Sequence, residues 1–130
     1  MEKTMTRSEQ REKAMITVYQ YLLMKRDIDE LIENVYEVPS AEIDQYFRNV
    51  ITYSVNNEER YAGYIGQVLK TGWSYERLGC IEKAILLNGC SEFDLKQVQA
   101  AVIIDEAVEL AKKYCDSDTY KLINSVLDVI

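Results

Sequence analysis

The sequence predicts an all-α fold of about seven helices, and three observations lead to this prediction. Apolar residues recur at spacings of three and four along most of the chain, the pattern of a helix with one buried face. The 130 residues include one proline, so few positions interrupt a helix. No segment alternates apolar and polar residues for long enough to indicate a strand.

The first three helices are predicted from capping residues and apolar stripes. Thr6 to Glu9 has the T-x-x-E form of a capping box, in which a hydroxyl and a carboxylate satisfy free N–H groups at a helix start. Asp27 to Glu30 indicates a second start, and Ser40 a third, after Pro39 ends the second helix. The predicted buried faces are Met15, Val18, Tyr19 and Leu22; Ile28, Leu31, Ile32, Val35 and Tyr36; and Ile43, Phe47, Val50 and Ile51.

Asn56–Asn57 breaks the pattern and is the joint where two halves of a single domain would meet, residues 5–55 and 56–130. The fourth helix follows, with Tyr61, Tyr64, Ile65, Val68 and Leu69 as its buried face. Gly63 and Gly66 inside it each cost about 1 kcal/mol relative to alanine. We therefore expect another helix to approach closely at these two glycines.

Three helices complete the predicted bundle. Gly72 ends the fourth helix, Ser74 begins the fifth, and Asn88–Gly89 is predicted to end it, with a short turn at Ser91–Phe93. A long helix covers about residues 98–114, and Asp116 or Ser117 caps the last one. The buried faces are Leu78, Ile81, Ala84 and Ile85; Ile104, Ala107, Val108 and Ala111; and Ile123, Val126, Leu127 and Ile130.

The composition indicates an ordinary globular domain, with 48% hydrophobic and 28% charged residues. No apolar run approaches the roughly 18 residues that cross a bilayer, and the polar start does not resemble a signal peptide. We therefore expect a cytoplasmic protein. Its three cysteines are an odd number at no metal-binding spacing, which favours reduced thiols over a disulfide or a zinc site.

The net charge of −7 argues against a simple nucleic-acid binder, which usually has a basic face. The charge is uneven along the chain, however. Residues 1–26 carry six lysines and arginines against three acids, whereas residues 27–60 carry nine acids against two arginines. A basic end therefore precedes an acidic belt, which would suit a basic partner but is also typical of solvated surface.

Catalytic chemistry is poorly represented in the sequence. The chain has no histidine, the commonest general base and metal ligand, and it has no phosphate-binding P-loop. Asp105, Glu106 and Glu109 place carboxylates on adjoining helix faces, where a desolvated pair can transfer protons. The alternative is a solvated face with Glu109 and Lys113 as an ion pair one helical turn apart. We expect a protein that is not an enzyme and uses no cofactor or metal.

Four stretches resemble the NusB transcription antitermination family, and they follow the family's order along nearly the whole chain. The most specific is "VIIDEAVELAKKY" with "SDTYKLINSVLD", at residues 102–114 and 117–128. "WSYERLGCIEKAIL" at residues 73–86 resembles the family's tryptophan–arginine–E-K-A helix. "YFRNVI" at 46–51 and "QREKAMITVY" at 10–19 are similar to two further motifs.

The resemblance implies a compact seven-helix fold of two small subdomains and a role without catalysis. In the family, the protein pairs with NusE, a small-subunit ribosomal protein, and binds the boxA element of nascent RNA. The complex helps RNA polymerase to read through terminators, notably in ribosomal RNA operons. The partners implied for this chain are thus boxA-type single-stranded RNA, NusE and the antitermination complex of RNA polymerase.

The resemblance also implies site residues. The basic start of the first helix, where a helix N-terminus favours phosphate, would contact RNA, and Arg11 matches the arginine of the family's R-E motif. The last interhelical turn would lie close enough to this start to hold the same RNA strand. The RNA-binding residues so predicted are Lys3, Arg7, Arg11, Lys13, Tyr19, Asp118, Tyr120 and Lys121, and Glu82 is predicted near NusE. Core packing for Tyr19, a helix cap for Asp118 and a plain surface charge for Glu82 remain as alternatives.

This sequence departs from the family pattern at four single positions: Leu87 replaces an arginine, Leu122 an aromatic residue, Ser125 a glycine and Asp105 an asparagine. The family's usual opening of three arginines is also reduced to Arg7 and Arg11, with Glu9 between them. Only Tyr120 would then replace the lost stacking group at 122. Each missing cation weakens RNA binding, so we expect feeble RNA affinity for the isolated chain. The alternative is a protein–protein interaction module of the same fold that has lost RNA binding. Exposed tyrosines, among the ten in the chain, would also suit a homodimer.

Overall fold

The computed structural model describes residues 5–130 and contains only helical elements in that range, so the all-α prediction is confirmed. The α-helices are α1 (Arg7–Met24), α2 (Ile28–Tyr36), α3 (Gln45–Asn56), α4 (Glu58–Val68), α5 (Cys80–Leu95), α6 (Ala100–Tyr114) and α7 (Thr119–Val129). Two 3₁₀ helices, η1 (Ser40–Glu42) and η2 (Tyr75–Arg77), precede α3 and α5. Among these residues no helix is long and apolar enough to span a membrane.

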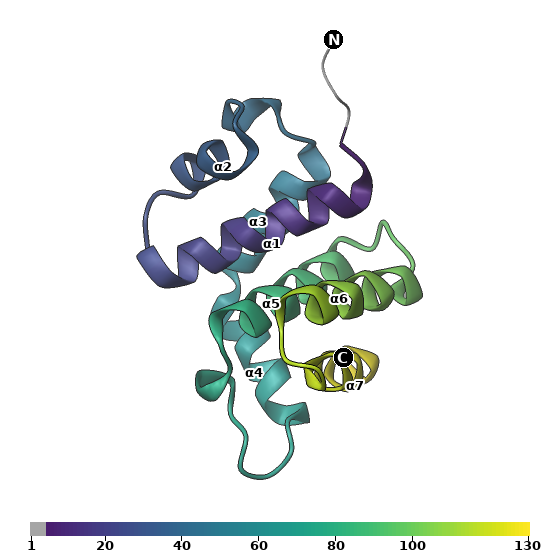
Figure 1. Cartoon of the computed structure of the whole chain (residues 1–130). Helices are drawn as coiled ribbons and strands as arrows, with labels where there is room; N and C mark the ends of the chain where they lie inside the picture. Colours follow the sequence, from purple (N-terminus) through teal and green to yellow (C-terminus); the bar gives the residue numbers. More distant parts are fainter. Residues whose placement is uncertain (1–4) are drawn as a thin grey trace.

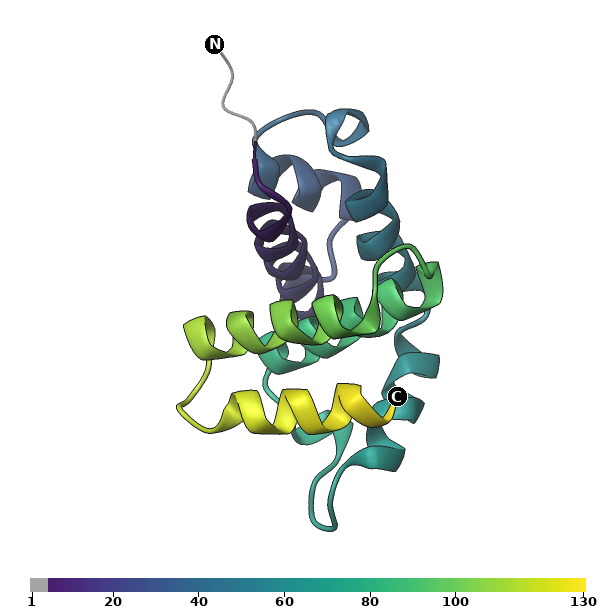
Figure 2. The same cartoon turned by 90° about the vertical axis from the view of Figure 1, so that its right-hand side faces the viewer.

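α5 is the central helix of the bundle. It packs against α1 and α3 above it in Figure 1, and against α4 and α7 below it, while α6 runs alongside. α2 covers α1 on the side away from α5. Figure 2 shows α6 and α7 side by side as an antiparallel pair, with the turn that joins them, residues 115–118, at the left edge of the view.

One continuous hydrophobic core joins α1, α2 and α3 to α4, α5, α6 and α7. Its largest fully buried side chains include Met15 of α1, Phe47 of α3, Tyr61 of α4, Leu86 of α5 and Ile123 of α7. Burying an aliphatic or aromatic side chain contributes roughly 1.5–3 kcal/mol relative to leaving it in water. Burial of these stripes, rather than helix propensity, therefore stabilises the fold.

The N-terminal helices begin where the capping residues predict, with one exception. Thr6 Oγ1 accepts from Glu9 N at 3.0 Å and Glu9 Oε1 accepts from Thr6 N at 2.9 Å, which completes the capping box. Asp27 caps α2 by accepting from Glu30 N at 3.1 Å. Ser40 does not cap α3: it lies in η1, and Asp44 caps α3 by accepting from Tyr46 N at 2.8 Å.

The predicted boundaries of the fifth helix are wrong. Ser74 precedes only η2, and α5 begins at Cys80 and continues through Asn88–Gly89 to Leu95. Gly89 serves packing, because a Cβ there would lie 2.9 Å from Leu127 Cδ2 of α7. Asn88 Oδ1 accepts from Ser54 Oγ of α3 at 2.6 Å. The Asn-Gly pair that resembles a helix stop is thus used for contacts of α5 with its neighbours.

Other details of the pattern also differ from expectation. Among residues 5–130, a Cβ at Gly63 or Gly66 would meet nothing within 4 Å, so no helix of that range approaches them closely. Ile103, rather than Ile104, is buried on α6, and Ile130 is 39% exposed instead of inward. The cysteines, all within the described residues, are free thiols as predicted, and burial raises the pKa of the Cys90 thiol to about 12.

Candidate nucleic-acid interface

The cations predicted at the start of α1 are directed to different parts of the molecule. Arg7 lies 3.5 Å from Asp44 and over the Phe47 ring, so it faces α3. Lys13 Nζ donates to the Val35 carbonyl of α2 at 3.2 Å. Lys3 lies outside the described residues. Of the cations that the structure describes here, Arg7 and Lys13 therefore do not form one free cationic tip.

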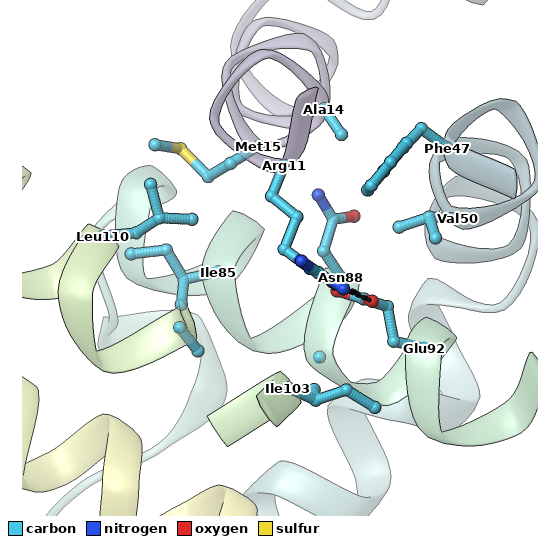
Figure 3. A pocket seen from close by; sticks show the side chains of 12 residues that line it. Arg11, Ala14, Met15, Phe47, Val50, Ile85, Asn88, Glu92, Ile103 and Leu110 are labelled. Carbon is cyan, nitrogen blue, oxygen red and sulfur yellow. Dashed lines mark hydrogen bonds and ion pairs between the residues drawn. The ribbon is translucent and has the colours of Figure 1, made fainter. Parts of the chain in front are cut away.

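Arg11 is buried, whereas its predicted role as a phosphate ligand would need an accessible guanidinium. Its side chain is 7% exposed and forms a bidentate ion pair with Glu92 of α5, Nε to Oε2 at 3.0 Å and Nη2 to Oε1 at 2.9 Å. Nη1 donates to Glu106 Oε1 of α6 at 3.2 Å. Figure 3 shows the guanidinium pointing from α1 toward Glu92, beside a cavity of about 20 Å³. Each of the three guanidinium nitrogens donates to a carboxylate within the fold, and little of the group reaches the surface.

Tyr46 of α3 completes this cluster by donating to Glu92 Oε1 at 2.7 Å. Burial lowers the pKa of the Arg11 guanidinium, but the hydrogen bonds to Glu92 and that carboxylate's charge outweigh burial, so the net pKa is raised. Burial, followed by the hydrogen bond to Glu92, raises the pKa of Tyr46. The cluster therefore stays charged on Arg11 and joins α1, α3, α5 and α6.

Exposed cations lie close to two tyrosine rings, exposed Tyr114 and half-buried Tyr120, at the C-terminal end of α6 and the start of α7. Lys112 Nζ lies 5.0 Å from the centroid of the Tyr120 ring, and Lys113 Nζ lies 5.5 Å from that of Tyr114. Lys121 is 67% exposed and lies 3.5 Å from Asp118. We call Lys112, Lys113, Tyr114, Tyr120 and Lys121 the α6–α7 basic surface.

Glu12 connects α1 to this surface. Its Oε2 accepts from Lys113 Nζ at 2.7 Å and also from the Tyr114 hydroxyl. The hydrogen bonds from Lys113 and Tyr114 lower the pKa of the Glu12 carboxyl below 4.5. Burial and the bond to Glu12 raise the pKa of Tyr114 to about 12. The start of α1 and the α6–α7 turn are thus linked through the end of α6.

The groove between α1 and α6, with a volume of about 410 Å³, is rich in carboxylates. Glu9, Glu12, Glu106 and Glu109 line it together with Arg11, Lys112 and Lys113. Glu106 accepts from Ser8 Oγ at 2.6 Å as well as from Arg11. Glu109 pairs with Lys112 at 3.6 Å instead of the expected Lys113. These carboxylates serve ion pairs and hydrogen bonds within the fold.

A second groove, of about 470 Å³, lies between the segment after α4 and the start of α7. Trp73, Lys70 and Leu69 line one side, and Lys121, Leu122 and Val126 are among the residues of the other. Asp116 and Asp118 also line it, and Asp118 is 84% exposed. Asp118 occupies the N-cap position of α7, but its side chain makes no capping hydrogen bond.

The remaining predicted residues are half-buried. Tyr19 packs against the core from α1. Glu82 lies in the first turn of α5 with its carboxylate against Gly79, where a Cβ would clash with it. Burial and the negative charges of Glu82 and Asp116 raise the pKa of the Cys115 thiol to about 11. Glu82 therefore lies near the α6–α7 turn.

Sequence reasoning missed Glu12, Lys112, Lys113, Tyr114 and Trp73. All five stand inside the quoted motifs, but their spacing gives no sign that they share a surface. The departure at position 87 proves to be internal, because Leu87 is 1% exposed. The replacement of the family's arginine by Leu87 therefore removes no positive charge from the surface of this chain.

Comparison with known proteins agrees with this architecture. The sequence profile of the NusB family matches residues 8–130. Transcription antitermination protein NusB of Exiguobacterium sp. is 36% identical over 126 residues, which cover 95% of this chain and 94% of that protein. The crystal structure of antitermination factors NusB and NusE in complex with dsRNA is similar with a TM-score of 0.80 and 27% identity, over 96% of each chain. The solution structure of NusB from Aquifex aeolicus is similar with a TM-score of 0.75 and 30% identity, over 94% of this chain and 84% of that one. Because the profile and the relative both extend over nearly the whole sequence, this chain belongs to the NusB family.

Proposed function

We propose that this chain is a non-catalytic transcription antitermination factor that binds boxA-type single-stranded RNA together with NusE. The observation that carries the proposal is its similarity, over 96% of each chain, to a NusB that was crystallised with NusE and dsRNA. By this proposal it acts with the antitermination complex of RNA polymerase in the cytoplasm. The chain then contributes binding surfaces and no reactive group.

The α6–α7 basic surface supports the RNA-binding part of the proposal. Single-stranded RNA is held by cations that neutralise phosphates and by aromatic rings that stack on bases. Lys112, Lys113 and Lys121 are each more than half exposed, and Tyr114 and Tyr120 lie beside two of them. The surface therefore offers both kinds of group within one helical hairpin.

Arg7 extends the proposed path toward α1. Its side chain is 53% exposed, and its ion pair with Asp44 has a separation of 3.5 Å. Exposed ion pairs contribute about 0–1 kcal/mol, so a phosphate group can compete with Asp44 for this guanidinium. Arg11 lies beneath the same end of α1 and supports it structurally.

Electrostatics supports a basic protein partner. The chain carries a net charge of −7, and its acidic residues are concentrated in residues 27–60. Proteins of the small ribosomal subunit bind RNA and are generally basic, so charge complementarity would speed their association with this chain. Glu82, half-buried at the start of α5, remains the residue proposed to face NusE.

A titration of labelled RNA tests the proposal. A single-stranded boxA oligonucleotide and its duplex are each titrated with the full-length chain, in the presence and absence of NusE. We expect tighter binding to the single strand than to the duplex, and much tighter binding when NusE is present. The absence of RNA binding in both conditions would contradict the proposal.

A second candidate is a protein–protein interaction module that has lost RNA binding. The intramolecular contacts of Arg7, Arg11 and Lys13 favour it, because they reduce the free positive charge on α1. In the same titration, this candidate predicts that the labelled RNA stays unbound. The chain should nevertheless bind NusE. Size-exclusion chromatography of the chain alone tests whether it forms a homodimer.

A further inference from the structure

Trp73, the single tryptophan of the chain, is unusually exposed for its size. Its side chain is 54% exposed, although tryptophan is one of the more buried residue types on average. It follows a tight turn in which Trp73 N donates to the Lys70 carbonyl at 3.0 Å. The turn depends on Gly72, whose φ of +93° disfavours any side chain. Arg77 Nη1 donates to the Gly72 carbonyl at 3.2 Å, which fixes the turn further. The indole is thus held on a constrained turn without being buried in the core.

The groove beside Trp73 contains both apolar and cationic groups. Leu69, Leu122 and Val126 supply apolar side chains, and Lys70 and Lys121 bring one ammonium from each side. Its volume of about 470 Å³ is that of a small ligand site. Lys121 belongs both to this groove and to the α6–α7 basic surface, so the two are continuous.

We propose that this groove binds one nucleobase of single-stranded RNA, stacked on Trp73, with the neighbouring phosphates at Lys70 and Lys121. The proposal deepens the proposed function and rests on it, because it names where a base of that RNA is held. Base stacking on an aromatic side chain tolerates any base, since every base has a flat π-face. Lysines on both sides of a stacking ring are the arrangement that a single strand requires.

The acidic residues of the groove determine which part of a bound nucleotide faces them. Asp116 and Asp118 repel phosphate but accept hydrogen bonds from the amino groups of a base. A base stacked on Trp73 would therefore present its amino edge to these carboxylates and its backbone to the lysines. Bases with an amino group are expected to be preferred over uracil.

The departure at position 122 lies in the same groove. Where the family motif has an aromatic residue, this chain has Leu122, and Leu122 lines the same groove as Trp73. In this chain the groove therefore keeps the tryptophan of the family motif as its aromatic ring, on the segment after α4, and has an aliphatic side chain on α7. Two side chains distant in sequence would together provide the stacking surface.

The intrinsic fluorescence of Trp73 reports the proposed contact directly, because no other tryptophan contributes. Unlabelled single-stranded boxA RNA is titrated into the full-length chain while tryptophan emission is recorded, and binding is measured in parallel by the anisotropy of end-labelled RNA. We expect quenching that follows the binding curve. Trp73→Phe should keep RNA affinity within about twofold, and Trp73→Leu should weaken it about tenfold.

Tyr53→Leu is the matched control, since Tyr53 is an exposed aromatic of α3 outside the groove and its loss should leave affinity unchanged. RNA binding without quenching, with Trp73→Leu at wild-type affinity, would overturn this inference and leave the proposed function intact. If NusE but not RNA alters the emission, the groove belongs to the protein partner and the inference fails. No RNA binding by any form of the chain, with or without NusE, would end both proposals.

Discussion

Arg11 and Glu92, 81 residues apart in the sequence, form a bidentate ion pair inside the protein. The pair lies where α1, α3, α5 and α6 meet, and Tyr46 donates a further hydrogen bond to the same carboxylate. A charge buried in this way is tolerated only while its partner remains, because an unpaired buried ion loses its hydration without compensation. The arginine that sequence motifs associate with RNA is therefore required by the fold of this chain.

Arg11→Met should lower the free energy of unfolding by about 3–5 kcal/mol, because it leaves Glu92 buried and unpaired. Urea denaturation followed by circular dichroism measures the loss. The double variant Arg11→Met with Glu92→Met should lose less than the sum of the two single variants, since it removes both charges. Arg7→Met is the exposed control and should change stability by less than about 1 kcal/mol. Equal small losses for Arg7 and Arg11 would contradict the structural role.

Alanine substitutions at Gly63 of α4 and Gly89 of α5 distinguish the effect of helix propensity on stability from the effect of helix packing. Gly63→Ala in α4 should raise the free energy of unfolding by about 0.5–1 kcal/mol, because alanine favours the helix and its Cβ meets nothing within 4 Å. Gly89→Ala in α5 places a Cβ 2.9 Å from Leu127 Cδ2. This overpacking costs about 1–3 kcal/mol, more than the same gain in helix propensity, so the variant should be less stable than the wild type. Thermal denaturation of the two variants is the measurement. A stabilising Gly89→Ala would show that α5 and α7 are farther apart than described.

The Glu12 carboxyl should titrate below its ordinary pKa of 4.5, because Lys113 and Tyr114 donate to its ionised form. A carboxyl whose pKa is lowered by folding stabilises the protein at pH values above its unfolded pKa. That contribution is lost as the pH falls through the lowered folded value. The contacts of Glu12 with α6 should therefore persist at neutral pH and weaken below about pH 4.5.

A ¹³C NMR titration of the Glu12 carboxyl carbon measures this pKa. Lys113→Met should raise it, because the hydrogen bond from Lys113 is the largest cause of the shift. Lys112→Met is the matched control, since Lys112 pairs with Glu109 and should leave the Glu12 titration unchanged. An unchanged pKa in Lys113→Met would mean that the ion pair between α1 and α6 does not form in solution.

Removing Lys121 should flatten the salt dependence of RNA binding. Each phosphate neutralised on a single strand contributes about 0.7 to the slope of log affinity against log salt. Lys121→Gln should reduce the slope by roughly that amount, and Lys112→Gln by a similar amount. Lys96→Gln, at the opposite end of α6 from the α6–α7 turn, is the control and should leave the slope unchanged. Identical slopes in all three variants would place the RNA elsewhere on the molecule.

The sequence predicts the helices well where local chemistry decides, and less well where distant contacts decide. The capping box at Thr6 and the cap at Asp27 involve residues three positions apart, so the sequence alone identifies them. Asn88 and Gly89 have the composition of a helix end, yet the helix continues because Ser54 and Leu127 occupy the space around them. Ser54 and Leu127 are distant in the sequence, so the residues around Asn88 contain no signal of these contacts.

The residues of the candidate site also divide into those that the sequence identifies and those that only the structure identifies. Lys121 and Lys112 are exposed beside half-buried Tyr120, and the family motif already indicates that region. Arg11 matches a motif equally well, but only the structure shows two glutamates, from α5 and α6, at its guanidinium. Trp73 is half-exposed, and only the fold places it beside Leu122. Sequence motifs identify residues that matter without telling whether each faces the solvent or the core.

The position of α5 has a consequence for how the protein is made. α1 and α3 both pack on α5, so when the first 56 residues have left the ribosome they still lack a large part of their apolar contacts. The chain becomes able to fold stably only after synthesis has passed Leu95. A fragment that ends before Cys80 should accordingly remain largely unfolded and exposed to proteases, whereas the whole chain should unfold in a single cooperative transition.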